Sequence, residues 1–404
     1  MNAAVSNEST RGWIKGLLPL TMGGFSIGMT EFLMMGVLPD VSRSLDVSIP
    51  TAGYLIAIYA FGVVIGAPLM TGLSRSFSPK KILIVLMMLF AIFNTLFSLA
   101  PTFSLLLLTR FMAGLPHGAF FGVGAVVATQ LAPGKGASAV AIMFTGLTLA
   151  NIFGVPVGTF IGHHFSWRIA YFLVAFCGVI SLMCLIKWLP DVVLENSPSF
   201  LHSFKIFRSS EIWFIIGISA IGTGGLFAWI SYIAPLMTDV AMFSDNMVTF
   251  IMMIAGLGMA IGNLLGGRIA DRFPPLVVTG FLLFIMMICL LTVALVSKNQ
   301  TGALMMTFVT GAVAFAVVPA MQMLMIQAAK GSEMLASSMV QASANMGNTL
   351  GAYLGGLPIV AGFGYTSPEY VGIALAFVGL IFCFMIQLTK NAGENNEIKI
   401  LVNN

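Results

Sequence analysis

The feature that most constrains this chain is a succession of long apolar runs, each about the 20 residues that a membrane-spanning helix requires. Of the 404 residues, 58% are hydrophobic and only 8% are charged, against about 25% charged in a typical soluble domain. In lipid, only helices and closed barrels satisfy their own backbone groups. Barrel strands alternate apolar and polar residues, whereas these runs are continuous. The sequence therefore predicts an all-α membrane protein.

Charges and turn residues divide the apolar runs into twelve predicted transmembrane helices. Their ranges are 14–38, 51–73, 82–100, 103–128, 138–162, 169–189, 212–235, 248–267, 276–297, 302–327, 334–360 and 369–389. The longest polar segment divides the twelve helices six and six. We expect a disordered cytoplasmic N-terminus at 1–12, an N-terminal six-helix bundle at 13–189, a cytoplasmic linker at 190–211, a C-terminal six-helix bundle at 212–390 and a cytoplasmic tail at 391–404.

The distribution of Lys and Arg predicts the orientation. Fourteen of the 18 basic residues fall on the side of the N-terminus if all twelve helices cross the membrane. Three fall on the opposite side, namely Arg43, Arg168 and Lys298, and Arg110 lies within a span. Cytoplasmic loops carry the excess of Lys and Arg, so we expect both termini in the cytoplasm. The net charge of +4 then reflects membrane topology and gives no reason to expect nucleic-acid binding.

The two predicted six-helix bundles repeat one another. Pro39 and Pro235 end the first helix of each bundle at an offset of 196 residues, and Arg75 aligns with Asp271 at the same offset. NIFGVPVG at 151–158 and NTLGAYLG at 348–355 match at an offset of 197. We infer two pseudo-symmetric halves that arose by duplication. Transporters built from two parallel repeats bind substrate between the halves, near the middle of the membrane.

Several motifs resemble those of the major facilitator superfamily over nearly the whole chain. GGRIADRF at 266–273 is similar to its loop signature, and FSWR at 165–168 is similar to the segment that precedes helix 6. RFMAGLPHGAFFG at 110–122 and GLTLANIFGVPVGTFIG at 146–162 resemble signatures of its proton-coupled drug and sugar antiporter branch. GMTEFLMMGVLPD at 28–40 most resembles the arabinose-efflux-permease group. The first-half loop departs from the pattern, with Arg75 where Asp is usual, and Val155 replaces a usual Gly.

The resemblance implies the major facilitator fold and secondary active transport by alternating access. It favours proton-coupled efflux of small organic solutes, either sugars such as arabinose or amphipathic drugs, as in multidrug resistance. A proton symporter or a uniporter of a small neutral solute with the same fold is the alternative. The implied location is the inner membrane of a bacterium, and we expect the partners to be the solute, protons and the lipid bilayer, with the chain acting as a monomer.

Two ionisable residues, Glu31 and Arg110, lie clearly inside predicted helices. A charge there costs about 2.5–3.5 kcal/mol or more, which favours a functional use. Each lies seven residues from the same membrane face, so both sit about 10 Å deep. Burial disfavours a charged carboxylate, and a nearby guanidinium favours it. We hypothesise that Glu31 is a proton site tuned by Arg110. A permanent ion pair that ties helix 1 to helix 4 is the alternative.

Further residues are candidates for proton transfer and substrate binding. His117 lies two turns after Arg110 and is a candidate proton relay, or else a histidine bonded to backbone. We expect amides and aromatic residues of the second half to bind substrate, or alternatively to join helices: Phe227, Trp229, Tyr232, Gln322, Gln341, Asn345 and Asn348. His163 and His164 lack further ligands at metal-binding spacing and are expected to be exposed.

A third set is expected to serve conformational change. The resemblance implies that Gly267 packs helices and that Asp271 and Arg272 bridge cytoplasmic helix ends. Pro156 loosens helix 5, and Gly154 and Gly158 belong to its signature. The spacing of Gly114, Gly118 and Gly122 predicts close contact between helix backbones.

Other classes of protein are disfavoured. GKGAS at 134–138 lacks the first glycine and the spacing of a phosphate-binding loop, so ATP hydrolysis is not expected. Two ionisable residues inside the membrane do not make up a catalytic constellation, and the four cysteines have no metal-ligand spacing. We therefore expect neither an enzyme nor a cofactor. A receptor or scaffold usually carries an added soluble domain, and the largest polar segment here is too short to form one.

Overall fold

The computed structural model describes the whole chain except residues 1, 48, 74–76, 193–203, 245–246 and 403–404. The described residues form helices and contain no strand, which confirms the all-α prediction. The first half consists of α1 (Asn2–Leu45), α2 (Ile49–Leu73), α3 (Pro79–Leu99), α4 (Phe103–Leu131), α5 (Gly136–Leu149), the π-helix η1 (Ala150–Gly154), α6 (Val155–His164) and α7 (Trp167–Trp188).

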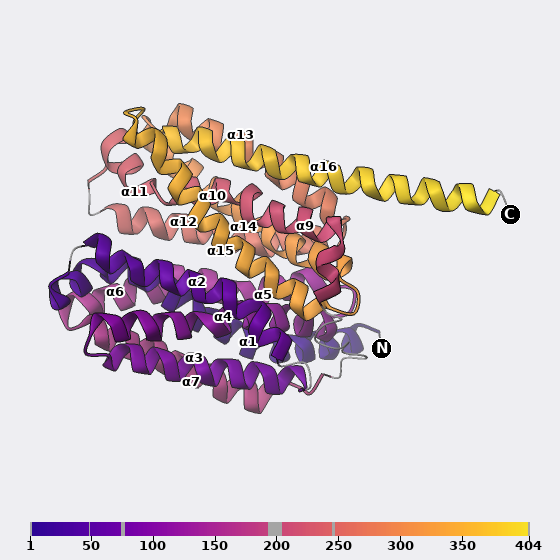
Figure 1. Cartoon of the computed structure of the whole chain (residues 1–404), viewed down its shortest axis with the longest axis horizontal. Helices are drawn as coiled ribbons and strands as arrows, with labels where there is room; N and C mark the ends of the chain where they lie inside the picture. Colours follow the sequence, from indigo (N-terminus) through magenta and orange to yellow (C-terminus); the bar gives the residue numbers. More distant parts are fainter. Residues whose placement is uncertain (1, 48, 74–76, 193–203, 245–246, 403–404) are drawn as a thin grey trace.

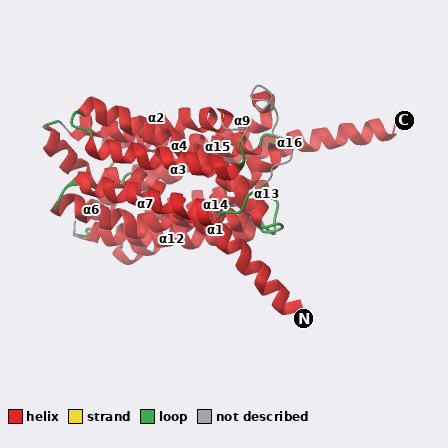
Figure 2. Cartoon of the chain, turned by 90° about the horizontal axis from the view of Figure 1, so that it is seen from below, coloured by secondary structure: helices red, strands yellow, loops and turns green. Residues whose placement is uncertain are grey.

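The second half follows the same plan with more interruptions. Its elements are η2 (Phe204–Arg208), α9 (Ser210–Gly217), η3 (Ile218–Gly222), α10 (Gly224–Ile230), α11 (Ile233–Pro235), η4 (Leu236–Val240), α12 (Val248–Ala270), α13 (Pro275–Val296), α14 (Gln300–Ala328), α15 (Glu333–Val360) and α16 (Ser367–Val402). The two halves lie side by side as separate bundles, and both chain termini lie at one end of the molecule (Figures 1 and 2). We call this end the terminal end.

Eleven helices within the described residues are long and apolar enough to cross a membrane. The predicted span at 334–360 corresponds to α15, which is 28 residues long but more polar than the others. Its polar residues face the protein interior, where Ser337, Ser338, Gln341, Ser343 and Asn345 are buried. A helix whose polar side is enclosed by protein does not need to be apolar all round, which explains why α15 is the exception. Its exposed positions, such as Met346 and Leu357, are apolar.

Both ends of the chain continue a helix beyond the predicted span. Helix α1 begins at Asn2, so most of the segment 1–12 that we expected to be disordered is helical, and α16 continues to Val402 through most of the predicted tail at 391–404. Neither extension contains proline, so the backbone hydrogen-bond ladder can continue beyond the apolar span. Half of the predicted linker at 190–211, namely residues 193–203, lies outside the described residues.

The seventh predicted helix, expected as one run over 212–235, is interrupted instead. We call it helix 7; it corresponds to α9, η3, α10 and α11 and is distinct from α7. The π-helix η3 separates α9 from α10, and a turn at 231–232 precedes α11. Four glycines lie in or beside the first interruption, and a Cβ on one of them, Gly222, would lie only 2.9 Å from the Cα of Gly379 in α16. Helix 5 carries a π-helix as well, η1, directly before Pro156. Since proline donates no backbone hydrogen bond, this irregularity agrees with the expected loosening.

Helices α2 and α4 touch backbone to backbone. A Cβ on Gly66 would lie 2.1 Å from the carbonyl oxygen of Leu115, and one on Gly114 would lie 2.3 Å from that of Tyr59. Only glycine allows so close an approach, because a real Cβ cannot come this near to a backbone oxygen. The contact confirms the close packing predicted from the glycine spacing and fixes the height of Tyr59 against α4.

Candidate functional site: a cavity between the two halves

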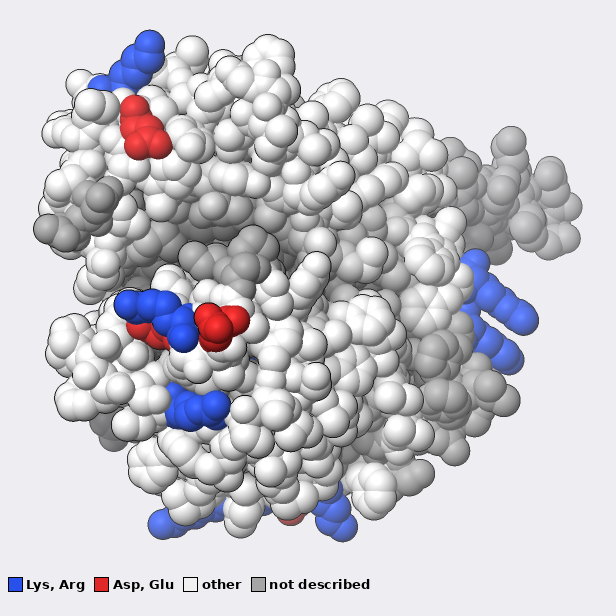
Figure 3. Space-filling model, turned by 60° about the vertical axis from the view of Figure 1, so that its left-hand side comes forward, with Lys and Arg blue, Asp and Glu red and all other residues white. Residues whose placement is uncertain are grey.

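A cavity of about 830 Å³ lies between the two halves. Residues of both bundles line it, among them Glu31 and His117 of the first and Phe227 and Asn345 of the second. Its wall includes His163 and His164 at the end of α6, at the end of the molecule opposite the terminal end. Figure 3 shows a hollow between the halves from this side. We call this end the mouth end.

The cavity wall contains one acidic residue. Among the described residues that line the cavity, Glu31 is the sole carboxylate, and no lysine or arginine contributes. Most of the lining is apolar or aromatic, including Phe32, Phe144 and Phe315, and the amides come from Asn151, Gln341, Asn345 and Asn348. The surface therefore offers apolar contact, a few hydrogen-bonding groups and a single negative charge.

Positions related by the duplication meet across this cavity. Asn151 of η1 and Asn348 of α15, which the repeat aligns, both line it. Glu31 and Phe227, aligned at an offset of 196, also both line it. The two halves thus present equivalent positions to one space, but with different chemistry.

Arg110 lies behind the cavity wall and is completely buried. Its Nη1 donates to the carbonyl oxygen of Thr30 at 3.2 Å and to the Thr30 Oγ1 at 3.0 Å, and its Nε donates to the carbonyl oxygen of Leu55 at 3.3 Å. Its Nη2 has no hydrogen-bond partner among the described residues. The guanidinium therefore binds the residue next to Glu31 and keeps one donor uncommitted.

Glu31 and Arg110 form no direct ion pair. Within the described residues, the ion pairs join Asp40 to Arg43 and to His163. Glu31 and Arg110 are nevertheless close enough to interact electrostatically. The equal depth inferred from the sequence agrees with this placement, but the alternative of a permanent ion pair does not describe this conformation.

Three aromatic rings surround the guanidinium of Arg110. The distances from its Cζ to the ring centroids are 4.4 Å for Tyr59, 5.3 Å for Phe97 and 5.5 Å for Tyr171. A cation over an aromatic face is attracted by the ring quadrupole, so these rings replace part of the hydration that burial removes. The sequence analysis did not single out these residues, although a tyrosine inside an apolar run was a signal that could have been used.

A short polar network holds Thr30, the residue to which Arg110 donates. The Tyr171 hydroxyl donates to the carbonyl oxygen of Thr30 at 3.4 Å, and the Thr30 hydroxyl donates to the Asn94 Oδ1 at 2.6 Å. The Asn94 Nδ2 in turn donates to the carbonyl oxygen of Phe90 at 2.8 Å. Thr30 is thus held from three sides, and it precedes Glu31 directly in α1.

His117 lines the cavity while being almost entirely buried. Its Nδ1 lies 3.0 Å from the Tyr59 hydroxyl. The expected alternative of a bond to backbone is not what the structure contains, because the partner is a side chain of α2.

The predicted substrate residues divide into two groups. Phe227, Gln341, Asn345 and Asn348 line the cavity. The other three face elsewhere: Trp229 is fully buried in the core of the second half, the Tyr232 hydroxyl donates to the carbonyl oxygen of Ala352, and the Gln322 Oε1 accepts from the Ser337 hydroxyl. Phe227 and Trp229 lie two residues apart in α10, about 200° around the helix, so Trp229 faces the core instead of the cavity. Gln322 forms an interhelical bond.

The terminal end is closed by contacts between the halves. Asp271 accepts hydrogen bonds from the backbone N–H groups of Ala137, at 2.8 Å, and Ser138, at 3.2 Å, at the start of α5. The Asn263 Nδ2 donates to the carbonyl oxygen of Ala141 at 2.6 Å. These bonds place a second-half carboxylate on the N-terminus of a first-half helix, where the helix dipole favours negative charge.

Other residues expected to serve conformational change occupy related positions. A Cβ on Gly267 would lie 2.9 Å from the carbonyl oxygen of Ala137, so this glycine permits the closure. Arg272 is exposed, and no described ion pair joins it to Asp271. Gly154 and Gly158 accommodate Met29 and Leu33 of α1. Arg75, the first-half counterpart of Asp271, lies outside the described residues.

The first half contacts the second at the terminal end through a different kind of bond. The hydroxyl groups of Thr71 in α2 and Ser338 in α15 lie 2.8 Å apart. A Cβ on Gly122 of α4 would lie 2.5 Å from the Cα of Ser338, so the three helices meet closely here. This contact is uncharged, unlike the one made by Asp271.

The mouth carries a small ionic cluster. Asp40, near the end of α1 that lies at the mouth, is 2.6 Å from the Arg43 Nη2 and 2.5 Å from the His163 Nδ1. His163 and His164 are exposed, as expected. Among the described residues, no group of three His, Cys, Asp or Glu residues could hold a metal ion.

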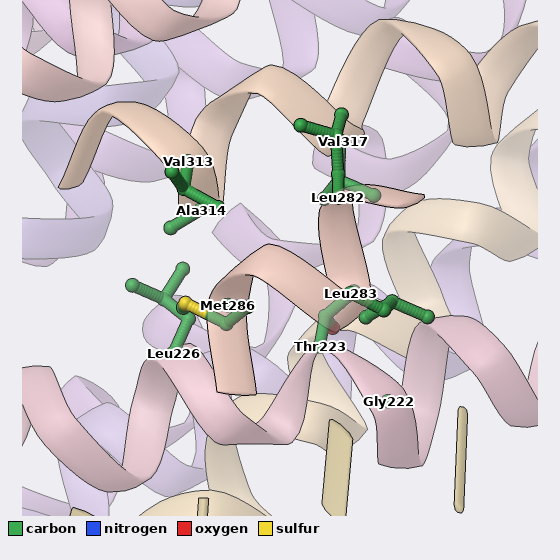
Figure 4. A pocket seen from close by; sticks show the side chains of 9 residues that line it. All are labelled: Gly222, Thr223, Leu226, Leu282, Leu283, Met286, Val313, Ala314 and Val317. Carbon is green, nitrogen blue, oxygen red and sulfur yellow. The ribbon is translucent and has the colours of Figure 1, made fainter. Parts of the chain in front are cut away.

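A second, much smaller space adjoins the cavity within the second half. It has a volume of about 20 Å³ and is enclosed by η3 and α10, α13 and α14. The side chains that line it are almost all apolar, among them Leu226, Met286 and Val317 (Figure 4). Thr223 and Leu226 also line the large cavity. The space thus lies directly beside the interruption of the seventh predicted helix.

Comparison with known proteins identifies relatives over almost the whole chain. The family model of the Major Facilitator Superfamily matches residues 20–334. The inner membrane transport protein YdhP of Escherichia coli (strain K12) is 41% identical over 370 residues, which cover 91% of this chain and 95% of YdhP. A relative named AraJ, from the same strain, is 38% identical over 367 residues, which cover 91% of this chain and 93% of AraJ.

A solved structure has the same fold. It is the major facilitator transporter FucP in the outward conformation, with a TM-score of 0.76 and 16% identity, covering 93% of this chain and 99% of the FucP chain. A second FucP structure, described as the fucose:proton symporter of E. coli, matches with a TM-score of 0.75.

Proposed function

We propose, since the chain belongs to the Major Facilitator Superfamily, that this transporter exports small organic solutes in exchange for protons by alternating access. Members of this family are multi-pass membrane transporters, and the chain is accordingly not an enzyme. The inner membrane of a bacterium, the location given in the name of the relative YdhP, is the proposed location. The excess of Lys and Arg supports cytoplasmic termini.

The observation that carries the proposal is the placement of Glu31. It is the sole acidic residue among the described lining of the cavity, it interacts electrostatically with the buried Arg110, and it directly follows the threonine that Arg110 binds. A carboxylate in such a cavity can hold either a proton or a cationic group of a solute. If the two compete for Glu31, release of one accompanies binding of the other, which is the requirement for exchange.

The closed terminal end supports placing this conformation at the outward-facing step of the proposed transport cycle. With cytoplasmic termini, the mouth opens to the outside and the Asp271 contact closes the cytoplasmic side. In this state a proton from outside can reach Glu31 as the solute leaves. Reversal of the opening exposes Glu31 to the cytoplasm, where the proton departs and a new solute binds.

The cavity chemistry supports an amphipathic solute. Pockets for drug-sized ligands measure about 300–1,000 Å³, and the volume of about 830 Å³ lies within this range. Phe32, Phe144, Phe227 and Phe315 offer aromatic faces, and a cation over such a face is attracted to it. The amides near Asn345 offer hydrogen bonds that a sugar also uses, so sugars belong in the same test.

Proton symport of a small neutral solute is the second candidate. The observation that favours it is the shared fold with FucP, which is described as a fucose:proton symporter. The same Glu31 would then carry a proton together with the solute. The two functions differ in the sign of their response to a pH gradient, so one measurement separates them.

The decisive experiment is counterflow in proteoliposomes with a panel of sugars and cationic drugs, at two internal pH values. Exchange predicts that a proton gradient drives the solute against the direction of proton flow, and symport predicts the same direction. Folded protein that transports no member of the panel would contradict the proposal. Counterflow that proceeds identically at both pH values would indicate a uniporter.

A further inference from the structure

We propose that Tyr59 is a positioning residue, which holds the imidazole of His117 in one tautomer and connects it to the Arg110 site. A role of Tyr59 in proton coupling rests on the proposed function, because His117 and Glu31 line the same cavity. The contacts of Tyr59 with His117 and Arg110 do not depend on that function. Tyr59 belongs to α2, does not line the cavity and is only 2% exposed. A direct contact with the transported solute is therefore not its role.

The side chain of Tyr59 contacts both ionisable residues of α4. Its ring lies under the guanidinium of Arg110, 4.4 Å from the Cζ to the centroid. Its hydroxyl lies 3.0 Å from the Nδ1 of His117, about two helical turns farther along α4. One residue of a neighbouring helix thus spans the distance between the two, with its face toward one and its hydroxyl toward the other.

The backbone contact between α2 and α4 makes this arrangement rigid. Gly114, which lies between Arg110 and His117 in α4, meets the carbonyl oxygen of Tyr59 so closely that a Cβ would lie 2.3 Å from it. The backbone of Tyr59 is consequently held at a fixed position on α4, from which its hydroxyl reaches His117. Hydrogen bonds between rigid elements hold a catalytic or coupling group more exactly than contacts from loops.

The direction of the bond at Nδ1 is coupled to the position of the imidazole proton. In a neutral imidazole one nitrogen donates and the other accepts. If the tyrosine hydroxyl donates to Nδ1, the proton of His117 is on Nε2. When His117 becomes charged, Nδ1 must donate, and the hydroxyl has to turn its own hydrogen away. The orientation of one hydroxyl therefore follows the charge of His117 within a side chain that also supports Arg110.

The charged and titratable groups around Tyr59 are few and can be tested individually. Glu31 of α1, Arg110 of α4 and Tyr171 of α7 interact electrostatically with it, and His117 bonds to it. Helix α15, which also packs against α2, carries Glu333 at its first residue and an exposed Tyr353. The charged residues of α3, Lys80 and Lys81, lie in its first turn.

The test uses the full chain labelled with ¹⁵N at histidine, in nanodiscs. The chemical shifts of the ring nitrogens report which nitrogen is protonated, and His117 is assigned among the four histidines by its loss in H117N. The key variant is Y59F, which keeps the ring beneath Arg110 and removes the hydroxyl. The matched control is Y171F, which removes the hydroxyl bonded to the Thr30 carbonyl but none bonded to His117.

We expect wild type and Y171F to hold His117 in the Nε2-protonated tautomer. In Y59F the tautomer ratio should fall by about fivefold, the size expected for the loss of one ordinary hydrogen bond. An unchanged ratio in Y59F, or an equal change in both variants, would overturn the proposal. Because this readout needs no transport, it separates the role of Tyr59 from the proposed function.

A transport experiment then tests the connection. In the proteoliposome assay, Y59F should alter the pH dependence of transport. Y54F, which removes the exposed hydroxyl of another α2 tyrosine, should leave that dependence as in wild type. In an H117N background, Y59F should add no further change, since coupled residues are not additive. Additive effects of Y59F and H117N would contradict the proposal. A wild-type protein without any pH-dependent transport would instead contradict the proposed function.

Discussion

The two halves of this molecule share a plan but differ in the chemistry that they bring to the cavity. The first half contributes Glu31 and His117 to the wall, with Arg110 and Tyr59 behind it. The second half contributes Phe227 and the amides of α15. The two halves thus present matching backbone positions to the cavity, but the first carries the ionisable groups and the second carries apolar and amide side chains.

The same asymmetry exists at the terminal end. A second-half carboxylate, Asp271, accepts from the backbone at the start of α5. At the related start of α15, Glu333 of that helix accepts from the backbone N–H of Gly331 instead. The contact that Asp271 makes between the halves therefore depends on charge. The contact between Thr71 and Ser338 depends on two hydroxyl groups. The pseudo-symmetry of the backbone therefore does not extend to the side-chain bonds that join the two halves.

The largest effect is expected from Glu31→Gln. This change removes the sole carboxylate among the described cavity lining and should reduce pH-driven transport to the level of liposomes without protein, while counterflow of a neutral solute persists. Phe227→Leu, at the related position of the other half, should alter apparent affinity but retain the pH response. Undiminished pH-driven transport by Glu31→Gln would refute the proton site.

The next effect concerns stability. Arg110→Ala removes three hydrogen bonds and three cation–π contacts and should destabilise the protein by about 2–4 kcal/mol. Gln322→Ala, at a buried amide of the second half with one bond to Ser337, should cost about 1 kcal/mol. Thermal unfolding in detergent measures both, and equal losses would remove the distinction between the halves.

A smaller effect is expected from Asp271→Asn. The carboxylate caps α5 only while the terminal end is closed, so its neutralisation should weaken that closure by about 1 kcal/mol. The population of molecules with an open mouth should then fall by about fivefold at most. The readout is the labelling rate of Thr159→Cys, a cavity position, by an impermeant thiol reagent, with Glu333→Gln as the control. Faster labelling in Asp271→Asn would have the wrong sign.

The smallest effect is expected from His163→Gln. The bridge from His163 to Asp40 is charged only when the histidine is protonated, and His163 is exposed. Such pairs contribute about 0–1 kcal/mol, so stability should change little and pH-driven transport should remain. A loss of pH response comparable to that of Glu31→Gln would move the proton site from the cavity interior to its mouth.

Much of the fold could be predicted from sequence because the signals were long and repeated. Runs of about 20 apolar residues indicate helices regardless of tertiary context, and the offset of 196 indicated two halves. The exception, α15, has a polar interior face, and the interruption of helix 7 depends on close contacts such as that between Gly222 and Gly379. Contacts of this kind join residues far apart in the chain and leave no local pattern.

The site could be predicted only in part for a related reason. Glu31 was conspicuous as a charge in an apolar run, and the repeat placed it opposite Phe227. The neighbours of Arg110, namely Thr30, Tyr59 and Tyr171, are ordinary residues whose role depends on how three helices are rotated. Trp229 and Gln322 looked suitable for a solute by type, but their helix faces point into the core.

The glycine contact between α2 and α4 has a consequence for how such a chain can change over generations. Since Gly114 permits one relative setting of the two helices, Tyr59 and His117 cannot be adjusted separately by sliding one helix along the other. A lineage that loses the hydroxyl must also find a new use for the histidine. In an alignment of descendants, the two positions should change together, and the glycine should outlast them both.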